Sequence, residues 1–163
     1  VWQCGTIQVD FSMPERLNAT YITEDSQRKS PVMLHRAILG SFERFIGILI
    51  EHYEGKFPCW LSPIQIVVMS LTDRNSKTCE EISSLLSKNG YRSELDIRND
   101  KVGFKIREHT IQKIPFMLVI GDKEEESKKV SVRTREGNDL GAMSIDEFTI
   151  ILDKSISKLG RQL

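Results

Sequence analysis

An arginine near the start of an apolar segment is the residue best placed for chemistry. Arg44 follows Gly40 and Ser41 and lies in the first turn of a predicted helix that ends near Tyr53. Free backbone N–H groups at a helix start favour anions, and a guanidinium adds a permanently charged, two-pronged donor. The arrangement therefore indicates a phosphate site. The alternative is an exposed arginine that pairs with a neighbouring acid such as Glu43.

The histidines do not form a recognisable metal-binding pattern. His35 lies in a predicted apolar strand, and no second His or Cys stands nearby at a ligand spacing. Zinc takes three or four protein ligands, so the residues alone favour a hydrogen-bonded histidine over a metal ligand at this position. His52 and His109 are expected to be exposed on helices.

Composition by itself names no partner. The 163 residues include 23 basic and 23 acidic side chains, so the net charge is zero. No apolar stretch reaches membrane-spanning length, and no targeting signal opens the chain. Because the chain begins in what looks like strand sequence, we expect a piece of a longer protein. The widely spaced cysteines favour free thiols in a reducing compartment: Cys4, Cys59 and Cys79.

The first part of the chain is predicted to hold two strands and one helix. Residues 3–11 and 31–39 have the apolar alternation of strands, whereas residues 14–29 are polar and irregular. Ser41 is the expected N-cap of the helix, and Gly55 is placed to end it. Residues 54–63, with two prolines and a glycine, are then expected to be a linker.

The second part alternates strands and helices. The fold class predicted is α/β, a mixed five-stranded sheet packed between helices, preceded by the strand-strand-helix segment. Strand-helix-strand order favours parallel pairing, and two successive later strands favour an antiparallel pair. The pattern assigns strands to residues 64–70, 91–97, 115–120 and 129–134. It assigns helices to residues 75–89, to 100–112 and to a segment from residue 144 onward.

Helix starts in this second part are marked by polar residues. Thr78 with Glu81, and Ser144 with Glu147, have the spacing of capping boxes, and Asp100 is expected to cap the helix between them. The last helix is expected to bury an apolar stripe of Phe148, Ile151, Leu152, Ile156 and Leu159.

A basic run is the second candidate for function. From Arg98 to Arg135 there are ten Lys and Arg residues against six Asp and Glu. Such a surface suits unpaired RNA, whose bases are read by hydrogen bonds and stacking. Phe104 and Phe116 are interpreted as core residues, which leaves few aromatic side chains for stacking. The alternative is an ordinary solvated surface.

Several segments together resemble bacterial-type threonyl-tRNA synthetases, at their C-terminal end. The pattern Gly-x-x-Glu-Arg-Phe at residues 40–45 is typical of class II synthetases, and His35 with the sequence Gln-Cys-Gly-Thr at residues 3–6 narrows the match to threonine enzymes. The resemblance covers essentially the whole chain. It implies that residues 1–59 end the class II catalytic domain, with its third signature motif, and that residues 60–163 form an anticodon-binding domain.

The resemblance implies roles for residues of the first part. Arg44 matches the signature arginine that contacts the ATP phosphates, and Gln8 matches a position near the reacting threonyl group, so these two are the expected catalytic residues. Gln3, Thr6 and Ser41 match positions around the ATP, which arrives with Mg²⁺ as substrate.

Further residues are matched to metal and RNA. His35 matches one ligand of a Zn²⁺ ion that grips the amino and hydroxyl groups of threonine. The anticodon-reading positions of the family are matched by Asn99, Lys101, Arg107, Glu124 and Arg133.

The implied function is that of a threonine–tRNA ligase, a cytoplasmic enzyme and homodimer at full length, with threonine, ATP and threonine tRNA as partners and no membrane association. The isolated piece is expected to be inactive, because the first two class II motifs and the other zinc ligands belong upstream. Two alternatives stay open. One is a stand-alone RNA-binding module without catalysis. The other, suggested only by the strand-helix rhythm, is a flavodoxin-like binder, which lacks a Gly-rich loop after residues 64–70.

Overall fold

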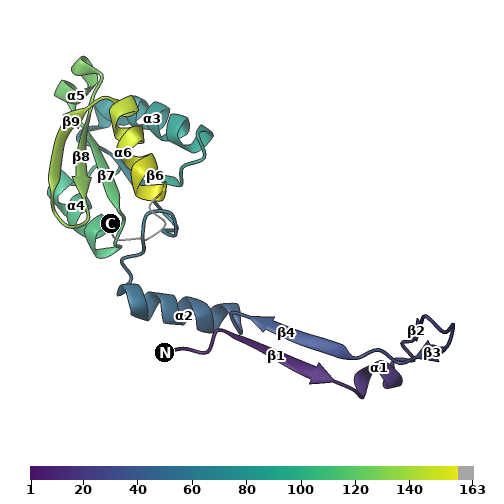
Figure 1. Cartoon of the computed structure of the whole chain (residues 1–163). Coiled ribbons are helices and arrows are strands. Elements are labelled where there is room, and N and C mark those ends of the chain that lie inside the picture. The colour runs from purple at the N-terminus through teal and green to yellow at the C-terminus, as the bar shows by residue number, and fades with distance from the viewer. Residues whose placement is uncertain (158–163) are drawn as a thin grey trace. The chain divides into compact units, whose positions relative to one another are not determined.

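The chain divides into two units, and only the C-terminal unit has a buried core. The computed structural model describes residues 1–157, so Leu159 of the predicted apolar stripe lies outside the described part. The contacts divide the chain into Val1–His52 and Tyr53–Leu163 (Figure 1). Within residues 1–157 no helix is long and apolar enough to cross a membrane.

The N-terminal unit is built on one long pair of strands. β1 (Gly5–Asp10) pairs antiparallel with β4 (Met33–Ile38), with Gln8 directly opposite His35. α2 (Phe42–Tyr53) follows β4. These elements confirm the predicted strand-strand-helix segment.

Two short features occupy the part predicted to be irregular. α1 (Met13–Arg16) has a proline in its first turn, and β2 (Tyr21–Ile22) pairs antiparallel with β3 (Arg28–Lys29). Ser26, in the turn between them, has a φ of 59°. The prediction of an irregular segment was wrong for these residues, because elements of two to four residues are too short to show a period.

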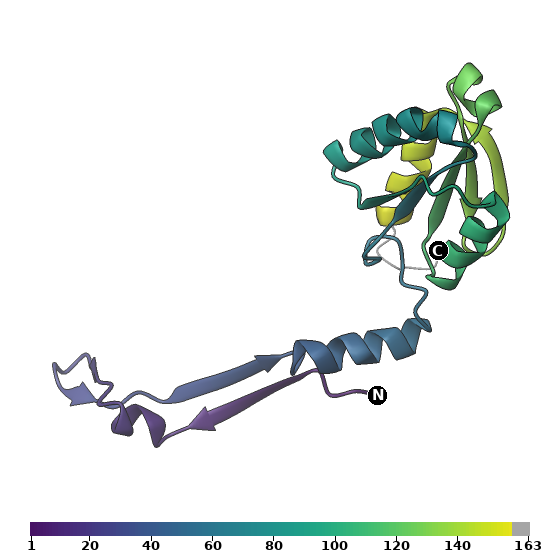
Figure 2. The same cartoon turned by 180° about the vertical axis from the view of Figure 1, so that it is seen from behind.

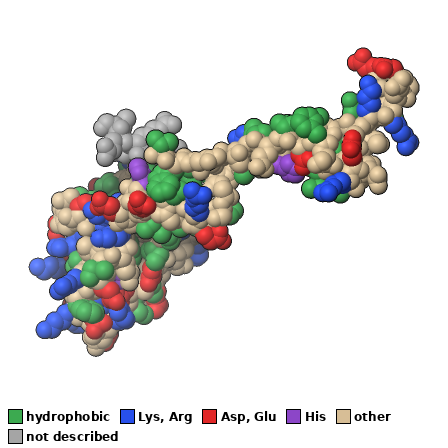
Figure 3. Space-filling view, turned by 90° about the horizontal axis from the view of Figure 1, so that it is seen from below, with side chains coloured by type: hydrophobic (Ala, Val, Ile, Leu, Met, Phe, Trp, Pro, Cys, Tyr) green, Lys and Arg blue, Asp and Glu red, His purple; other side chains and the backbone are tan. Residues whose placement is uncertain are grey.

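The N-terminal unit lacks a buried core of its own. Among residues 1–52, all of which the structure describes, only Pro14 is buried. Ile7, Val9, Leu34 and Phe42 are exposed, although the apolar alternation along residues 3–11 is typical of a strand that covers a core. Hydrophobic side chains are accordingly visible along this unit in Figure 3. Two strands without a covering layer are marginally stable in water, so this unit is expected to contribute little stability on its own.

The C-terminal unit contains the predicted five-stranded mixed sheet. Its strand order is β6-β5-β7-β8-β9, parallel between the first three strands and antiparallel for the last two pairs. β9 escaped the sequence pattern because it is an exposed edge strand of Asp, Leu, Gly, Ala and Met, with no β-branched residue. The strands are β5 (Ile66–Ser70), β6 (Ser93–Asp96), β7 (Phe116–Ile120), β8 (Val130–Thr134) and β9 (Asp139–Met143).

Helices cover both faces of the sheet. α3 (Ser76–Lys88) and α6 (Ile145–Ser157) lie on one face, and α4 (Val102–Ile111) lies on the other (Figures 1 and 2). The 3₁₀ turn η1 (Asp73–Asn75) precedes α3, and α5 (Asp122–Ser127) follows β7. The larger core lies under α3 and α6 and contains Val68, Leu86, Leu118, Val132, Phe148 and Leu152. The smaller core, under α4, contains Val67, Met69, Ile114 and Met117.

One predicted capping box is present and two other predicted caps are not. The Glu147 N–H donates to Ser144 Oγ at 3.2 Å, and the Ser144 N–H donates to Glu147 Oε2 at 2.8 Å. Thr78 was wrongly predicted as a cap: η1 starts the helix earlier, and Thr78 Oγ1 instead donates to Glu125 Oε1 at 2.7 Å. Asp100 was also wrongly predicted, because Lys101 is the N-cap residue of α4 and no side chain caps there.

Much of the predicted linker is packed onto the C-terminal unit. Cys59 and Ser62 are buried. The Arg92 guanidinium donates to the carbonyl oxygens of Ser62 at 2.9 Å and of Trp60 at 2.8 Å, and Arg135 Nη1 donates to Phe57 O at 2.7 Å. The contacts divide the chain between residues 52 and 53, whereas the predicted division between residues 59 and 60 stays a prediction.

Candidate functional site

A pocket in the N-terminal unit collects most residues predicted to surround a nucleotide. It has a volume of about 210 Å³ and is lined by Gln3, Gly5, Thr6, Ala37, Gly40 and Arg44. The start of β1, the end of β4 and the start of α2 supply these residues. An arginine and two polar side chains thus meet in one small hollow at a helix N-terminus, an arrangement that suits a phosphate.

A tight bend between β4 and α2 brings Arg44 to this pocket. Leu39 and Gly40 have φ angles of 67° and 73°, so two residues in the left-handed region end the strand before the helix begins. Ser41 Oγ then accepts a hydrogen bond from the Arg44 N–H at 3.2 Å, which confirms Ser41 as the N-cap of α2. Ser41 does not line the pocket itself.

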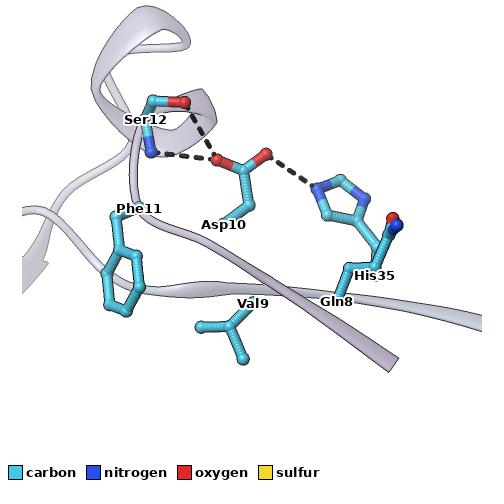
Figure 4. Close-up of a pocket in the computed structure, with 6 residues that line it drawn as sticks. All are labelled: Gln8, Val9, Asp10, Phe11, Ser12 and His35. Carbon is cyan, nitrogen blue, oxygen red and sulfur yellow. Dashed lines mark hydrogen bonds and ion pairs between the residues drawn. The ribbon is translucent and has the colours of Figure 1, made fainter. Parts of the chain in front are cut away.

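A second, open hollow lies further along the same strands and contains Gln8 and His35 (Figure 4). His35 Nε2 lies 3.0 Å from Asp10 Oδ2, and Asp10 Oδ1 accepts the N–H groups of Ser12 and Met13 at 2.9 Å each. The two backbone donors and then His35 hold the pKa of Asp10 well below its usual range. Sequence reasoning missed Asp10, whose partner stands 25 residues away.

The donor set around His35 does not complete a zinc site. Within residues 1–157 no three His, Cys, Asp or Glu side chains are grouped so as to hold a metal ion. One imidazole and one carboxylate fall short of the three or four ligands that zinc takes in proteins. The residues described therefore do not fit a zinc ion by themselves, and the ligand role of His35 stays a prediction.

Most of the predicted anticodon residues lie on the α4 side of the C-terminal sheet. Successive side chains of β8 point to opposite faces of the sheet, and Val132 lies in the core under α3 and α6. Arg133 therefore faces the other side, as does Met117 directly opposite it on β7. Asn99, in the loop before α4, and Lys101 and Arg107 on α4 are all exposed.

Local contacts engage two of the predicted anticodon residues. Arg133 Nη2 donates to Asp139 Oδ2 at 2.9 Å across β8 and β9. Glu124 Oε2 accepts the Gly121 N–H at 3.1 Å and so holds the start of α5, at the end of β7. Contact with RNA bases would compete with these bonds.

A buried charged network lies beneath α4, and the sequence did not reveal it. Lys105 Nζ donates to the carbonyl oxygens of Ser70 at 3.1 Å and Asp96 at 3.2 Å, which ties together the ends of β5 and β6. Asp96 also accepts hydrogen bonds from Arg98 at 2.8 Å and from His109 Nε2 at 2.8 Å. The prediction that His109 is exposed was wrong, because its ring points under the helix toward this carboxylate.

The network sets the charge state of Asp96. Burial disfavours the ionised form, but hydrogen bonds from Arg98 and His109 outweigh burial and hold the pKa of Asp96 well below its usual range. Bonds to Asp96 and Glu108 in turn raise the pKa of Arg98. Asp96 is therefore ionised throughout the neutral range.

The predicted basic surface is smaller than the residue count suggests. Arg98 pairs with acids, Lys105 is buried, and Arg135 is bound to the Phe57 carbonyl. Lys and Arg side chains are also intermixed with acidic ones on the face visible in Figure 3. RNA binding would therefore rest on particular residues rather than on bulk charge.

Two family models match the two parts of the chain. One, described as "tRNA synthetase class II core domain (G, H, P, S and T)", matches residues 1–53. The other, described as "Anticodon binding domain", matches residues 65–155.

The curated relatives that match this chain carry the name threonine–tRNA ligase. A "Threonine--tRNA ligase" of Pseudomonas syringae pv. syringae is 59% identical over 162 residues, which are 99% of this chain and 71% of that relative. The chain belongs to the threonine–tRNA ligase family. A second threonine–tRNA ligase, from Prochlorococcus marinus (strain MIT 9211), is 66% identical over 161 residues. Against that relative the chain spans only 25% of the length.

Solved structures extend the comparison. The RNA binding domain of threonyl-tRNA synthetase from Cryptosporidium parvum Iowa II matches with a TM-score of 0.80 and 35% identity, over 94% of this chain and 39% of that one. A prolyl-tRNA synthetase from Cryptosporidium parvum matches with a TM-score of 0.72 at 18% identity, over 96% of this chain and 35% of that one. The second likeness, at this low identity, shows a shared fold.

Proposed function

We propose that this chain is the part of a threonine–tRNA ligase that reads the anticodon of threonine tRNA and forms one wall of the ATP site. The observation that carries the proposal is the 59% identity to a threonine–tRNA ligase over nearly the whole chain. The match of residues 65–155 to an anticodon-binding family supports the assignment of RNA reading to the C-terminal unit.

The proposed reaction has two steps. A carboxylate oxygen of threonine attacks the α-phosphorus of ATP, and pyrophosphate leaves, which forms threonyl adenylate. A hydroxyl group of the tRNA 3′-terminal ribose then attacks the carbonyl carbon, and AMP leaves with the bonding electrons. Negative charge develops on phosphate oxygens in the first step, so cationic groups near them stabilise the transition state.

We assign Arg44 to the ATP phosphates, with Gln3, Thr6 and Ser41 around the nucleotide. This assignment is supported by the pocket that Arg44 shares with Gln3 and Thr6, and by the bond between Ser41 Oγ and the Arg44 N–H. Gln8 is assigned to the threonyl group. Mg²⁺ enters with ATP as substrate and offsets phosphate charge.

We assign His35 as a single ligand that this part of the enzyme contributes to a zinc ion. The remaining ligands belong to chain outside these 163 residues. The orientation of the ring by Asp10 supports the assignment, because carboxylates commonly orient metal-binding imidazoles. Threonine, a second copy of the full-length chain and a cytoplasmic location complete the proposal.

We assign the reading of the anticodon to a group of side chains in the C-terminal unit. Three of them belong to α4 or the loop before it, and Arg133 faces the same side of the sheet. The group consists of Asn99, Lys101, Arg107, Glu124 and Arg133.

The proposal is tested by filter binding of threonine tRNA and of the same tRNA with a swapped anticodon, at two salt concentrations. The wild-type chain should prefer threonine tRNA. Arg133→Ala should reduce that preference, by about 1–3 kcal/mol if the guanidinium contacts a base. Lys101→Ala should weaken the binding of both tRNAs alike. It should also lower the slope of log affinity against log salt concentration by about 1, as expected for a phosphate contact.

Lys154→Ala is the matched control, because Lys154 is exposed on α6, on the opposite face of the sheet. It should leave both affinities unchanged. An Arg133→Ala variant that loses affinity equally for both tRNAs would contradict its assignment to base reading. A wild-type chain without any preference would refute the proposed function.

A further inference from the structure

Helix α4 buries two polar side chains and exposes two large apolar ones, the reverse of a simple amphipathic helix. It buries Lys105, which is 0% exposed, and His109, which is 3% exposed. It exposes Phe104 at 57% and Ile111 at 67%. Phe104 was predicted to be a core residue, and that prediction was wrong, whereas Phe116 is buried as predicted. The reason is that Asp96 and the carbonyl oxygens at the strand ends hold Lys105 and His109 inward, which turns Phe104 outward.

Phe104 is flanked by two cations. Phe104 and Arg107 are three residues apart on α4, so they are neighbours on the helix surface, and Lys101 is the N-cap residue three positions before Phe104. Within residues 1–157 neither Lys101 nor Arg107 forms an ion pair, whereas nearby Arg98 pairs with three acids. The two free positive charges on either side of an exposed ring match a nucleic acid strand, in which phosphates alternate with flat bases.

The space beside Phe104 is open. Phe104 is 57% exposed, and Gly103 before it carries no side chain that could cover the ring. A planar group can therefore reach the exposed part of the ring. Base-on-aromatic stacking needs such access to one face of the ring, and it tolerates any base because each has a π-face.

We propose that Phe104 is a stacking platform for an unpaired base of the bound RNA loop, with Lys101 and Arg107 holding the phosphates on either side. This inference rests on the proposed function for its ligand, the anticodon loop. It adds an aromatic contact to a set of polar residues, and so it supplies the stacking that the basic run lacked.

The test uses the full 163-residue chain and a stem-loop RNA that carries a threonine anticodon. 2-Aminopurine replaces each unpaired loop base in turn, and its fluorescence reports stacking. One loop position should change its fluorescence on binding to the wild-type chain and lose that change with Phe104→Ala. The affinity should fall about 5- to 100-fold, and Phe104→Tyr should restore it. The salt slope should stay the same, because no charge is removed.

Ile111→Ala is the matched control, since Ile111 is an exposed apolar side chain on the same helix. It should bind like the wild-type chain, and both variants should show unchanged thermal unfolding. Equal binding by Phe104→Ala and the wild-type chain overturns the inference, as does an equal loss with Ile111→Ala.

The two proposals fail in different ways. If the wild-type chain binds the threonine loop and a swapped loop equally, and Phe104→Ala weakens the binding of both, anticodon reading is refuted and the stacking role is kept. If the wild-type chain prefers the threonine loop and Phe104→Ala binds both loops with unchanged affinity, stacking is refuted and anticodon reading is kept. A chain that binds neither RNA refutes both.

Discussion

At the scale of single residues, Asp96 carries the polar interior of the C-terminal unit. Its side chain is almost fully buried, yet it meets Arg98, His109 and the ammonium group of Lys105, 3.8 Å from Oδ1. A buried charge is tolerated only when it is paired and hydrogen-bonded. Removing one partner leaves the others uncompensated, so this carboxylate stabilises the attachment of α4 to the sheet.

Asp96→Asn should lower the free energy of unfolding at pH 7 by about 3–5 kcal/mol, as expected for breaking a buried ion pair. The pKa of Asp96 is lower in the folded chain than in the unfolded chain. Its ionised form therefore stabilises the fold above the unfolded pKa of about 3.9, and this contribution is lost as the pH falls toward the folded pKa. Urea unfolding at pH 7, 5 and 3 should show the gap between wild type and variant narrowing at pH 3.

The neighbouring Asp100→Asn is the control for this measurement. Asp100 is partly exposed and lies 3.9 Å from Arg98 Nη1, and such surface pairs contribute roughly 0–1 kcal/mol. A gap between wild type and Asp96→Asn that stays constant from pH 7 to pH 3 would contradict the account of the network.

At the scale of elements, the two faces of the sheet are held by different forces. α3 and α6 pack through apolar side chains such as Leu86, Phe148 and Leu152. α4 is attached by the network of Asp96 and Lys105 and by fewer apolar contacts. Polar attachment specifies one rotation of α4 about its axis, because each hydrogen bond has a required direction. That rotation is what presents Lys101, Phe104 and Arg107 together.

The capping box of α6 makes an element-scale prediction. Ser144→Ala removes the Oγ that accepts the Glu147 N–H, so the free energy of unfolding should fall by about 1 kcal/mol. Thr149→Ala, within the same helix, should have little effect or stabilise slightly, because alanine favours helix interiors. Thermal unfolding of the two variants measures the difference, and equal midpoints would show that the box contributes nothing.

At the scale of the whole molecule, the two units differ in whether they have a buried core. The C-terminal unit has two cores and a five-stranded sheet. The N-terminal unit exposes both faces of a two-stranded sheet, and the pocket proposed to hold the nucleotide is lined by residues of β1, β4, α2 and the segments next to them. The match to a relative four times as long agrees with this, since the chain spans 25% of that ligase.

The isolated 163-residue chain should accordingly fail to activate threonine. One wall of an ATP site positions phosphates poorly, and activation depends on accurate placement of both reactants. Threonine-dependent exchange of labelled pyrophosphate into ATP should stay at background, with a full-length threonine–tRNA ligase as the positive control. Exchange by the isolated chain at the rate of that control would refute this expectation.

The amino-acid sequence by itself determined the order of the longer helices and strands and the mixed character of the C-terminal sheet. Apolar runs of four to seven residues and helical stripes are local patterns, so the β-α-β order, the Ser144 capping box and the Ser41 N-cap were all readable. Recognition of the Gly-x-x-Glu-Arg-Phe pattern added the expected roles of Arg44 and its neighbours. The edge strand β9 was lost because its composition carries no strand signal.

Only the tertiary structure decided which charged residues are buried and which apolar ones are exposed. Asp96, Lys105 and His109 look like surface residues in a charged stretch, and Phe104 looks like core. Their environment depends on carbonyl oxygens and carboxylates brought together from β5, β6 and α4, up to 35 residues apart. Burial is set by packing between such distant segments, so no local period in the chain encodes it.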